Sequence, residues 1–391
     1  MPWGGMFRSG PARSQRGFPQ TAGGISGAFG PQVRTANSLR IARAAICGLS
    51  VRPGFGYEAP SIPDFEDSPL MTSTVTVFGG SGFLGRHTVR ALARAGYRVR
   101  VAVRHPNLAM YVLPAGNVGQ IEIRKTNVRD PDQVKAAVRG ADAVVNLVGV
   151  LYERGHQNFE EVHVEAAEAI ARAAKAEGAK TLVHVSAIGA NPEADSAYAT
   201  SKGEGERRVR AVFPDATILR PSIVFGPEDE FFNRFARLAR LSPVLPLIGG
   251  GHTKFQPVFV GDVAAAVLKC VEEAATQGKT YELGGANVYN FKELMEFILH
   301  VIGRKRLLVP WPFALATINA FFLQFWPKPL LTPDQVMLLK SDNVVTKGAK
   351  TLADLGIHPE SVEAIVPTYL WRFRARGQYE ATPSSPLSPT A

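Results

Sequence analysis

From residue 71 onward, short runs of β-branched residues alternate with segments whose apolar residues recur at helical spacing. This alternation is typical of a parallel sheet with helices on both faces. The runs predict strands at 74–79, 98–103, 120–126, 143–149, 181–187 and 217–222, with helices near 83–95, 131–139, 159–177 and 198–212. The pattern therefore predicts an α/β chain with a doubly wound parallel sheet.

After about residue 221 the regular alternation is lost, and the pattern predicts a smaller α/β lobe at the carboxyl edge of the sheet. We expect five parts: a leader-like or disordered extension (1–70), a nucleotide-binding domain (71–220), a small lobe of the kind that binds substrate (221–306), an apolar and helical docking region (307–378) and a disordered tail (379–391).

Composition and charge narrow the function classes only slightly. The net charge of +10 and the pI of about 9.7 suit anionic partners, but the basic residues are not interleaved with aromatics as in a nucleic-acid reading module. Two cysteines, Cys47 and Cys270, cannot form a disulfide framework, and no Cys/His cluster has metal-ligand spacing. We therefore expect a reducing compartment, no nucleic acid and no metal.

The first 57 residues contain seven arginines and no Asp or Glu. This composition is typical of disorder, of a transit-peptide-like leader, or of an extension translated ahead of a start at Met71. The sequence leaves these possibilities open.

A glycine-rich loop follows the first predicted strand. Gly79, Gly80, Gly82 and Gly85 satisfy the spacing that lets a backbone turn approach a pyrophosphate at a helix N-terminus. Because the loop opens the first β-α-β unit, the sequence predicts dinucleotide binding on a Rossmann fold. The loop's other residues, Ser81, Phe83 and Leu84, belong to the same predicted site.

The second predicted strand indicates which dinucleotide is preferred. No acidic residue between Asp67 and Glu122 could accept the ribose 2′-OH of NAD, whereas Arg86 and Arg104 could bind a 2′-phosphate. We therefore expect NADP(H) rather than NAD(H), although both arginines could be ordinary surface residues. The remaining predicted cofactor contacts, at strand ends where turn chemistry is the alternative, are Asn127, Val128, Val148, Gly149 and Pro221.

Tyr198 and Lys202 are spaced i,i+4 on the predicted helix that follows the fifth strand, so they share one face. An ammonium beside a phenol favours the phenolate, and this would lower the pKa of Tyr198 toward a range useful for acid/base chemistry. The same pair could donate hydrogen bonds to a cofactor ribose.

The stretches GGSGFLG, YATSK, RPSIVFGP and QPVFVGDVA together resemble the extended or atypical short-chain dehydrogenases/reductases, from about 72 to 300. The resemblance implies that Tyr198 is the acid/base, that Lys202 is its electrostatic partner and ribose anchor, and that Ser186 polarises the substrate oxygen. The family normally ends its fifth strand with a Ser-Ser or Ser-Thr pair, whereas Ala187 follows Ser186 here.

The tail from "LTPDQVMLLK" onward, with the apolar run before it, resembles the Rossmann-fold accessory subunit family of respiratory complex I (NADH:ubiquinone oxidoreductase). That resemblance implies a tightly held NADPH with a structural or regulatory role, complex I subunits as partners, and a matrix-side or cytoplasmic location at the respiratory membrane. The alternative is a soluble NADPH-dependent oxidoreductase or sugar-nucleotide epimerase/dehydratase that uses Tyr198 and Lys202.

The apolar run begins at Leu307 and has no charge until Lys328. Prolines at 310, 312 and 327 confine its predicted helix to about 313–326, which is shorter than the roughly 20 residues that a membrane-spanning helix needs. Its aromatic residues, with the basic stretch at 303–306, suit a membrane interface or a partner subunit; a buried helix of the small lobe is the alternative.

Overall fold

The computed structural model describes residues 73–155, 157–325, 329 and 331–379. The expectations for the extension 1–70, Cys47, Met71 and the tail from 380 lie outside these residues, as do those for Trp326, Pro327 and Lys328 of the apolar run.

A seven-stranded, all-parallel sheet forms the centre of the fold, with the strand order β11-β6-β5-β4-β1-β2-β3. Its strands are β1 (Thr74–Phe78), β2 (Arg98–Val103), β3 (Ile121–Lys125), β4 (Ala143–Asn146), β5 (Thr181–Val185), β6 (Thr217–Pro221) and β11 (Thr280–Leu283). The strand order reverses between β1 and β4, which is the point where doubly wound sheets bind ligands. The predicted fold class is confirmed.

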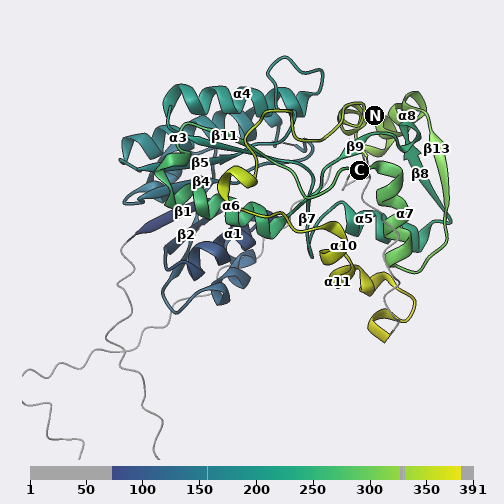
Figure 1. Cartoon of the computed structure of the whole chain (residues 1–391). Helices are drawn as coiled ribbons and strands as arrows, with labels where there is room; N and C mark the ends of the chain where they lie inside the picture. The colour runs from purple at the N-terminus through teal and green to yellow at the C-terminus, as the bar shows by residue number, and fades with distance from the viewer. Residues whose placement is uncertain (1–72, 156, 326–328, 330, 380–391) are drawn as a thin grey trace, which may run out of the picture. The chain divides into compact units, whose positions relative to one another are not determined.

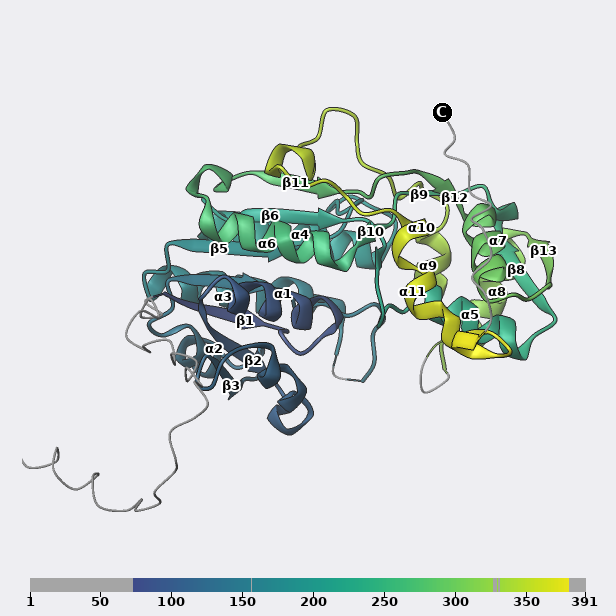
Figure 2. The same ribbon diagram turned by 60° about the horizontal axis from the view of Figure 1, so that its bottom comes forward.

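Helices cover both faces of the sheet, as Figures 1 and 2 show. One face carries α1 (Phe83–Arg94) and α6 (Val260–Glu272), and the other carries α2 (Pro131–Val138), α3 (Ala166–Ala176) and α4 (Ala197–Val212). A π-helical turn, η4 (Glu160–Glu165), leads into α3. The helix starts have clear causes: the Asp130 carboxylate accepts from the backbone N–H groups of Asp132 and Gln133, and the Ser196 hydroxyl accepts from Ala199.

The structure differs from the expected boundary at residue 220. After a first excursion into the smaller lobe, the chain returns to the sheet as α6, which packs beside α1, and as β11, which pairs with β6. Strand β11 has only four residues, which is too short a run to separate from a loop by periodicity. Cys270 on α6 is buried in the core, and burial raises the pKa of its thiol to about 12.

The smaller lobe packs around a cluster of phenylalanine rings, with Phe231, Phe235, Phe255 and Phe291 at centroid distances of 5.2 to 6.3 Å. Its helices are α5 (Phe232–Leu241), α7 (Phe291–Val301), α8 (Phe313–Leu323), α9 (Pro333–Leu338), α10 (Val362–Ile365) and α11 (Pro367–Leu370). Its strand pairs are β7 (Val224–Phe225) with β10 (Val258–Phe259), β8 (Val244–Ile248) with β13 (Leu307–Trp311), and β9 (Lys254–Phe255) with β12 (Tyr289–Asn290).

Short 3-10 turns complete the described chain: η2 (Pro106–Leu108), η3 (Met110–Ala115), η5 (Gly249–Gly251), η6 (Ala274–Thr276), η7 (Ala353–Leu355), η8 (Trp371–Phe373) and η9 (Gly377–Tyr379). The segment after α9 runs back to the main sheet, where the Asn343 side-chain oxygen accepts from the Ser222 hydroxyl at 2.6 Å and from the Ile223 N–H at 3.1 Å. The C-terminal region therefore contacts both the smaller lobe and the edge of the sheet.

Candidate functional site

The glycine loop between β1 and α1 has the geometry of an anion cradle. Gly79 has a φ of +76°, and a Cβ on Gly85 would lie only 2.3 Å from the Gly79 carbonyl oxygen, so the turn requires glycine at both positions. Gly82 is the N-cap of α1, no side chain caps the helix there, and its first turn has no acidic residue. The backbone N–H groups of that turn, together with the positive helix end, are thus suited to a phosphate.

The loop also meets the end of β4. A Cβ on Gly79 would lie 3.2 Å from the backbone carbonyl of Leu147, so the chain after β4 closes against the glycine turn. The predicted contacts Val148 and Gly149 follow directly, at the point where the strand order reverses. A Cβ on Gly149 would come within 3.2 Å of the Lys202 Nζ atom, so the absence of a side chain there leaves room for the lysine.

Arg86 lies at the rim of the loop in contacts that the sequence did not predict. Its guanidinium lies 4.7 Å from the centroid of the Tyr111 ring, and its Nη1 atom lies 3.4 Å from a carboxylate oxygen of Glu228. The Tyr111 hydroxyl donates to the backbone carbonyl of Ser81. Tyr111 and Glu228 lie 25 and 142 positions after Arg86, and neither belongs to a motif that would place it beside the loop.

Arg104 follows β2 and is exposed, and its guanidinium lies against the side-chain amide of Gln157. Asn127 builds the turn into α2: its side-chain oxygen accepts from the Arg129 N–H at 3.2 Å, and its own N–H donates to Gln133. Val128 packs against the neighbouring core. Turn formation thus accounts for Asn127 without a ligand, and cofactor contacts at Asn127 and Val128 stay a prediction.

Buried side chains fix the backbone after β4. The Asn146 side-chain oxygen accepts from the Val148 N–H at 3.0 Å, and Nε2 of His163 accepts from the Val150 N–H at 3.0 Å. Nδ1 of His163 lies 2.9 Å from the Ser201 hydroxyl, which donates to the Tyr198 carbonyl. Since Ser201 donates elsewhere, His163 carries its proton on Nδ1. Burial lowers the pKa of His163 to about 2 and keeps the ring neutral.

His163 lies within the candidate site, in contact with Ser201 and Tyr198, and the sequence did not indicate this position. It lies in the π-helical turn η4, and such turns often occur at functional sites. Its ring stacks on Phe159 at 5.3 Å and meets Tyr198 edge-on at 5.5 Å. In the sequence, His163 is a single histidine within an ordinary helical pattern, and nothing there indicates that it contacts Tyr198 or Ser201.

Lys202 is 5% exposed, and its Nζ atom lies 3.4 Å from the Val185 carbonyl oxygen. Burial lowers the pKa of its ammonium to about 8, and Glu206 opposes that shift. Tyr198 is half-buried, with its ring edge-on to Phe159 and His163.

The expectation that Lys202 lowers the pKa of Tyr198 is wrong. Burial and the Asp334 carboxylate raise the pKa of this phenol to about 12. Asp334 contacts the first turn of α4 from α9, where it accepts from the Ser196 hydroxyl at 3.0 Å, from the Ala197 N–H at 2.8 Å and from the Tyr198 N–H at 3.3 Å. The stretch Thr-Pro-Asp-Gln at 332–335 is a helix-start signal, but nothing in it indicates contact with a helix 138 positions earlier.

Ser186 lies at the end of β5 and is 4% exposed. Within the described part of the chain, its Oγ atom has no hydrogen-bond partner. Because a buried hydroxyl is normally paired, this atom fits a hydrogen bond to a ligand. Pro221 ends the neighbouring strand β6, and its carbonyl accepts from the Ile188 N–H at 3.0 Å.

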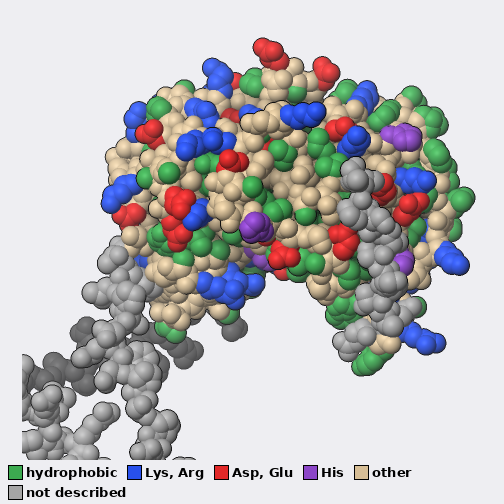
Figure 3. All heavy atoms as spheres, viewed as in Figure 1, with side chains coloured by type: hydrophobic (Ala, Val, Ile, Leu, Met, Phe, Trp, Pro, Cys, Tyr) green, Lys and Arg blue, Asp and Glu red, His purple; other side chains and the backbone are tan. Residues whose placement is uncertain are grey.

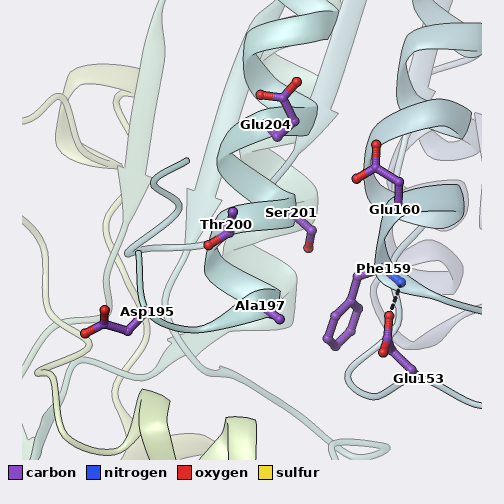
Figure 4. Close-up of a pocket in the computed structure, with 8 residues that line it drawn as sticks. All are labelled: Glu153, Phe159, Glu160, Asp195, Ala197, Thr200, Ser201 and Glu204. Carbon is purple, nitrogen blue, oxygen red and sulfur yellow. Dashed lines mark hydrogen bonds between the residues drawn. The ribbon is translucent and has the colours of Figure 1, made fainter. Parts of the chain in front are cut away.

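A groove of about 340 Å³ opens beside α4, and Figure 4 shows its lining residues. They are Glu153, Phe159, Glu160, Asp195, Ala197, Thr200, Ser201 and Glu204. The glycine loop is not among these lining residues, whereas Phe159 and Ser201 of the lining both contact His163. Among the described residues, no three His, Cys, Asp or Glu side chains lie close enough to hold a metal ion.

The apolar run forms β13 and α8. We define the docking face as the exposed residues Leu315, Ile318, Phe321, Phe322 and Phe325, which are 52 to 74% exposed. Only Ala316 and Ala320 of α8 are buried, so the alternative of a fully buried helix is wrong. Figure 3 shows hydrophobic side chains over the region of the smaller lobe that holds α8 and β13.

The basic stretch 303–306 precedes this run, and two of its arginines hydrogen-bond backbone carbonyls of the smaller lobe. The Arg304 guanidinium donates to the Phe373 carbonyl at 3.5 Å, and that of Arg306 donates to the Ala239 carbonyl at 2.7 Å. In the described ranges, no helix has both the length and the apolar character to cross a membrane.

Comparisons with known proteins are consistent along most of the chain. The NAD dependent epimerase/dehydratase family matches residues 75–284. The mitochondrial NADH dehydrogenase (ubiquinone) 1 alpha subcomplex subunit 9 of Arabidopsis thaliana is 35% identical over 327 residues, covering 81% of both chains. The mitochondrial NADH-ubiquinone oxidoreductase 40 kDa subunit of Neurospora crassa is 30% identical over 364 residues, covering 92% of both.

An enzyme is also similar to this chain. The ceramide reductase of Caulobacter vibrioides is 33% identical over 238 residues, which cover 61% of this chain and 73% of that protein. Among solved structures, the Escherichia coli NADPH-dependent quinone oxidoreductase QOR2 complexed with NADPH has a TM-score of 0.62 at 19% identity, covering 76% of this chain and 99% of that one. At that identity the likeness shows the fold alone.

Proposed function

Because this chain belongs to the NAD dependent epimerase/dehydratase family, and within it to the group that includes the alpha subcomplex subunit 9 of NADH dehydrogenase, we propose that it is an NADP(H)-binding accessory or assembly subunit of respiratory complex I. Its cofactor is mainly structural or regulatory. It associates peripherally with the respiratory membrane, on the matrix or cytoplasmic side.

The residues of the site fit a dinucleotide. Gly85 lies against the Gly79 carbonyl with no room for a side chain, and the uncapped first turn of α1 offers backbone N–H groups to a pyrophosphate. The Ser186 hydroxyl lacks a partner within the described residues, and the Lys202 ammonium is buried where ribose hydroxyls would hydrogen-bond it. A nicotinamide cofactor would supply hydride-transfer chemistry when bound.

The preference for NADP(H) rests on the rim of the cradle. No carboxylate lies between β1 and Glu122 to accept a ribose 2′-OH, whereas Arg86 follows the loop and Arg104 follows β2. A guanidinium can bind a phosphate through two parallel hydrogen bonds. We infer that a 2′-phosphate exchanges with the contacts of Arg86 to Glu228 and of Arg104 to Gln157.

The observation that carries the non-catalytic role is the position of Asp334. Its carboxylate holds the first turn of α4 and, with burial, raises the pKa of the Tyr198 phenol to about 12. A phenol with that pKa is a poor base near neutral pH. Ala187 also stands where the family pattern has a second hydroxyl after the fifth strand, and one missing donor of this kind typically costs about a hundredfold to a thousandfold in rate.

We propose that the docking face contacts an apolar surface of another complex I subunit at a membrane-proximal position. Five exposed large apolar side chains on and beside one short helix are unusual for a free surface. Arg304 and Arg306 donate to carbonyls of the lobe, so they contribute less to anionic lipid binding than their position in the sequence indicates. This favours a protein partner over a lipid surface.

A second candidate function is that of an NADPH-dependent reductase. It is favoured by the order of Ser186 directly after β5 and of Tyr198 and Lys202 on α4, which is the order that the family uses, and by the similarity to a ceramide reductase. If the chain is such an enzyme, Tyr198→Phe abolishes turnover of a carbonyl substrate while the cofactor stays bound. A chain with a structural cofactor keeps its function after the same substitution.

The test of the main proposal is capture of the tagged chain from detergent-solubilised respiratory membranes of its own organism, followed by mass spectrometry. We expect complex I subunits in stoichiometric amounts and a retained NADP(H). Phe322→Glu, which changes the docking face, should lose the complex I subunits but keep the nucleotide, whereas the exposed Leu241→Glu on α5 serves as a matched control. Recovery of the wild-type chain without any complex I subunit would contradict the proposal.

A further inference from the structure

Helix α9 lies between the docking face on α8 and helix α4, which carries Tyr198 and Lys202, and it contacts both. Helix α8 packs its Ala316 and Ala320 against Val336 of α9, and Ile248 of β8 completes this small cluster. The face of α8 that carries the exposed aromatic rings is thus backed by α9. Helix α9 in turn begins at Pro333, and its first turn contains Asp334.

Asp334 acts on α4 rather than on its own helix. Its carboxylate accepts from the Ser196 hydroxyl and from the N–H groups of Ala197 and Tyr198, at 3.0, 2.8 and 3.3 Å. Ser196 is already the N-cap of α4 and accepts from Ala199 at 3.3 Å. A carboxylate at this end of the helix also meets the positive end of the helix dipole. Three hydrogen bonds and the helix dipole thus favour the Asp334 carboxylate at the start of α4, although Asp334 lies more than 130 positions later in the chain.

The first turn of α4 continues directly into the cofactor site. Tyr198 lies in this first turn and Lys202 lies one turn later. The Tyr198 carbonyl accepts from the Ser201 hydroxyl, which lies 2.9 Å from Nδ1 of His163. His163 then holds the Val150 N–H beside Gly149, where the chain faces Lys202. A shift of the first turn of α4 would disturb every link of this series.

We propose that Asp334 is a positioning residue that couples NADP(H) occupancy to the seating of α8 and α9, and so to the docking face. This inference rests on the proposed function, because it needs a bound dinucleotide at α4 and a partner at α8. Coupling between two sites is reciprocal: a cofactor that orders α4 strengthens the seat of α9, and a partner that holds α8 tightens cofactor binding by the same factor. Such couplings are typically about 5- to 150-fold.

If Asp334 only stabilised the first turn of α4, without coupling the two sites, the variants would behave differently. Its removal would destabilise the chain, yet cofactor binding would still change the order of α9 to the same extent. The discriminating quantity is therefore the effect of NADPH on hydrogen exchange in 331–339, not the stability of the variant.

The experiment measures hydrogen-deuterium exchange of the full chain with and without NADPH, and the Kd of NADPH by calorimetry. The variants are Asp334→Ala, the isosteric Asp334→Asn and Ser196→Ala. Ser361→Ala serves as the control, since Ser361 caps the separate helix α10 in the same lobe by accepting from Ala364.

We expect NADPH to slow exchange in 331–339 of the wild-type chain and of Ser361→Ala by about tenfold, within the usual range of such couplings. In Asp334→Ala the slowing is lost and the Kd rises about tenfold, with Asp334→Asn between the two. If Asp334→Ala does not fold, Asp334→Asn and Ser196→Ala should show the same two changes in weaker form.

Unchanged slowing and an unchanged Kd in the folded variants would overturn the inference and leave the proposed function intact. A wild-type chain that binds no NADPH would overturn both, and capture of complex I subunits would then show separately whether the assignment to that complex survives.

Discussion

Replacement of Lys202 by methionine gives a prediction that follows directly from burial. The side chain is 5% exposed, and burial lowers the pKa of its ammonium from the ordinary 10.5 to about 8. A cation with a lowered pKa destabilises the folded chain wherever it is still protonated. Methionine has a similar length and no charge, so it removes this cost.

The magnitude follows from the two pKa values. At 1.36 kcal/mol for each factor of ten, the buried ammonium costs about 3 kcal/mol of unfolding free energy near pH 7 in the cofactor-free chain. The cost is fully present below about pH 8 and is relieved as the pH rises from about 8 to 10.5, because the unfolded chain then binds more protons than the folded one. Near pH 9.5 less than half of this cost remains.

The assay is urea unfolding of the chain after nucleotide removal on charcoal, near pH 7 and near pH 9.5. Lys202→Met should be more stable than the wild-type chain by up to about 3 kcal/mol at the lower pH, and this advantage should shrink by about half at the higher pH. With saturating NADPH the order should reverse, because the wild-type chain gains the binding energy of the ribose contact. Lys135→Met, at an exposed position on α2, is the matched control and should show neither effect.

Two results would refute this reasoning. One is a Lys202→Met chain that is less stable than the wild type without nucleotide near pH 7. The other is a difference in stability that does not change between the two pH values. Either result would mean that burial does not lower the pKa of the Lys202 ammonium in the folded chain.

Three further predictions concern the cradle and the docking face. Gly85→Ala places a Cβ 2.3 Å from the Gly79 carbonyl oxygen, so it should lower stability by about 1 to 3 kcal/mol and abolish nucleotide retention, as measured by thermal unfolding and by absorbance of the purified chain. The double variant Arg86→Ala/Arg104→Ala should weaken NADPH binding by about 10- to 100-fold and change NADH binding little, since only NADPH carries the phosphate; equal weakening of both in calorimetry would contradict the assignment. Phe322→Glu should leave the unfolding free energy within about 0.5 kcal/mol of the wild type, because the ring is 68% exposed, while co-migration with complex I in native gels is lost.

Local signals of the sequence predicted most of the first six strands and the tight glycine turn between β1 and α1. Runs such as 98–103 and 181–185 are short, β-branched and bounded by turn residues, and the glycine loop has a spacing that only a close backbone approach explains. The spacing of Tyr198 and Lys202 placed them on one helix face without any tertiary information.

The parts that the sequence did not predict depend on contacts between distant segments. Strand β11 returns to the sheet 59 positions after β6, and periodicity cannot show that pairing. Asp334, Tyr111 and His163 are ordinary residues in their local context and become part of the site only through packing. The pKa of Tyr198 was misjudged for this reason: the nearby lysine was visible in the sequence, but Asp334 and the degree of burial were not.

We propose that the glycine loop holds NADP(H), the dinucleotide with a 2′-phosphate, and that this cofactor is structural or regulatory rather than a reactant. The most direct measurement is native mass spectrometry of the full chain purified without added nucleotide, followed by calorimetry with NADPH and NADH. We expect one NADP(H) per chain and clearly tighter binding of NADPH than of NADH. A chain that carries NAD(H), or that binds neither nucleotide, would contradict this proposal.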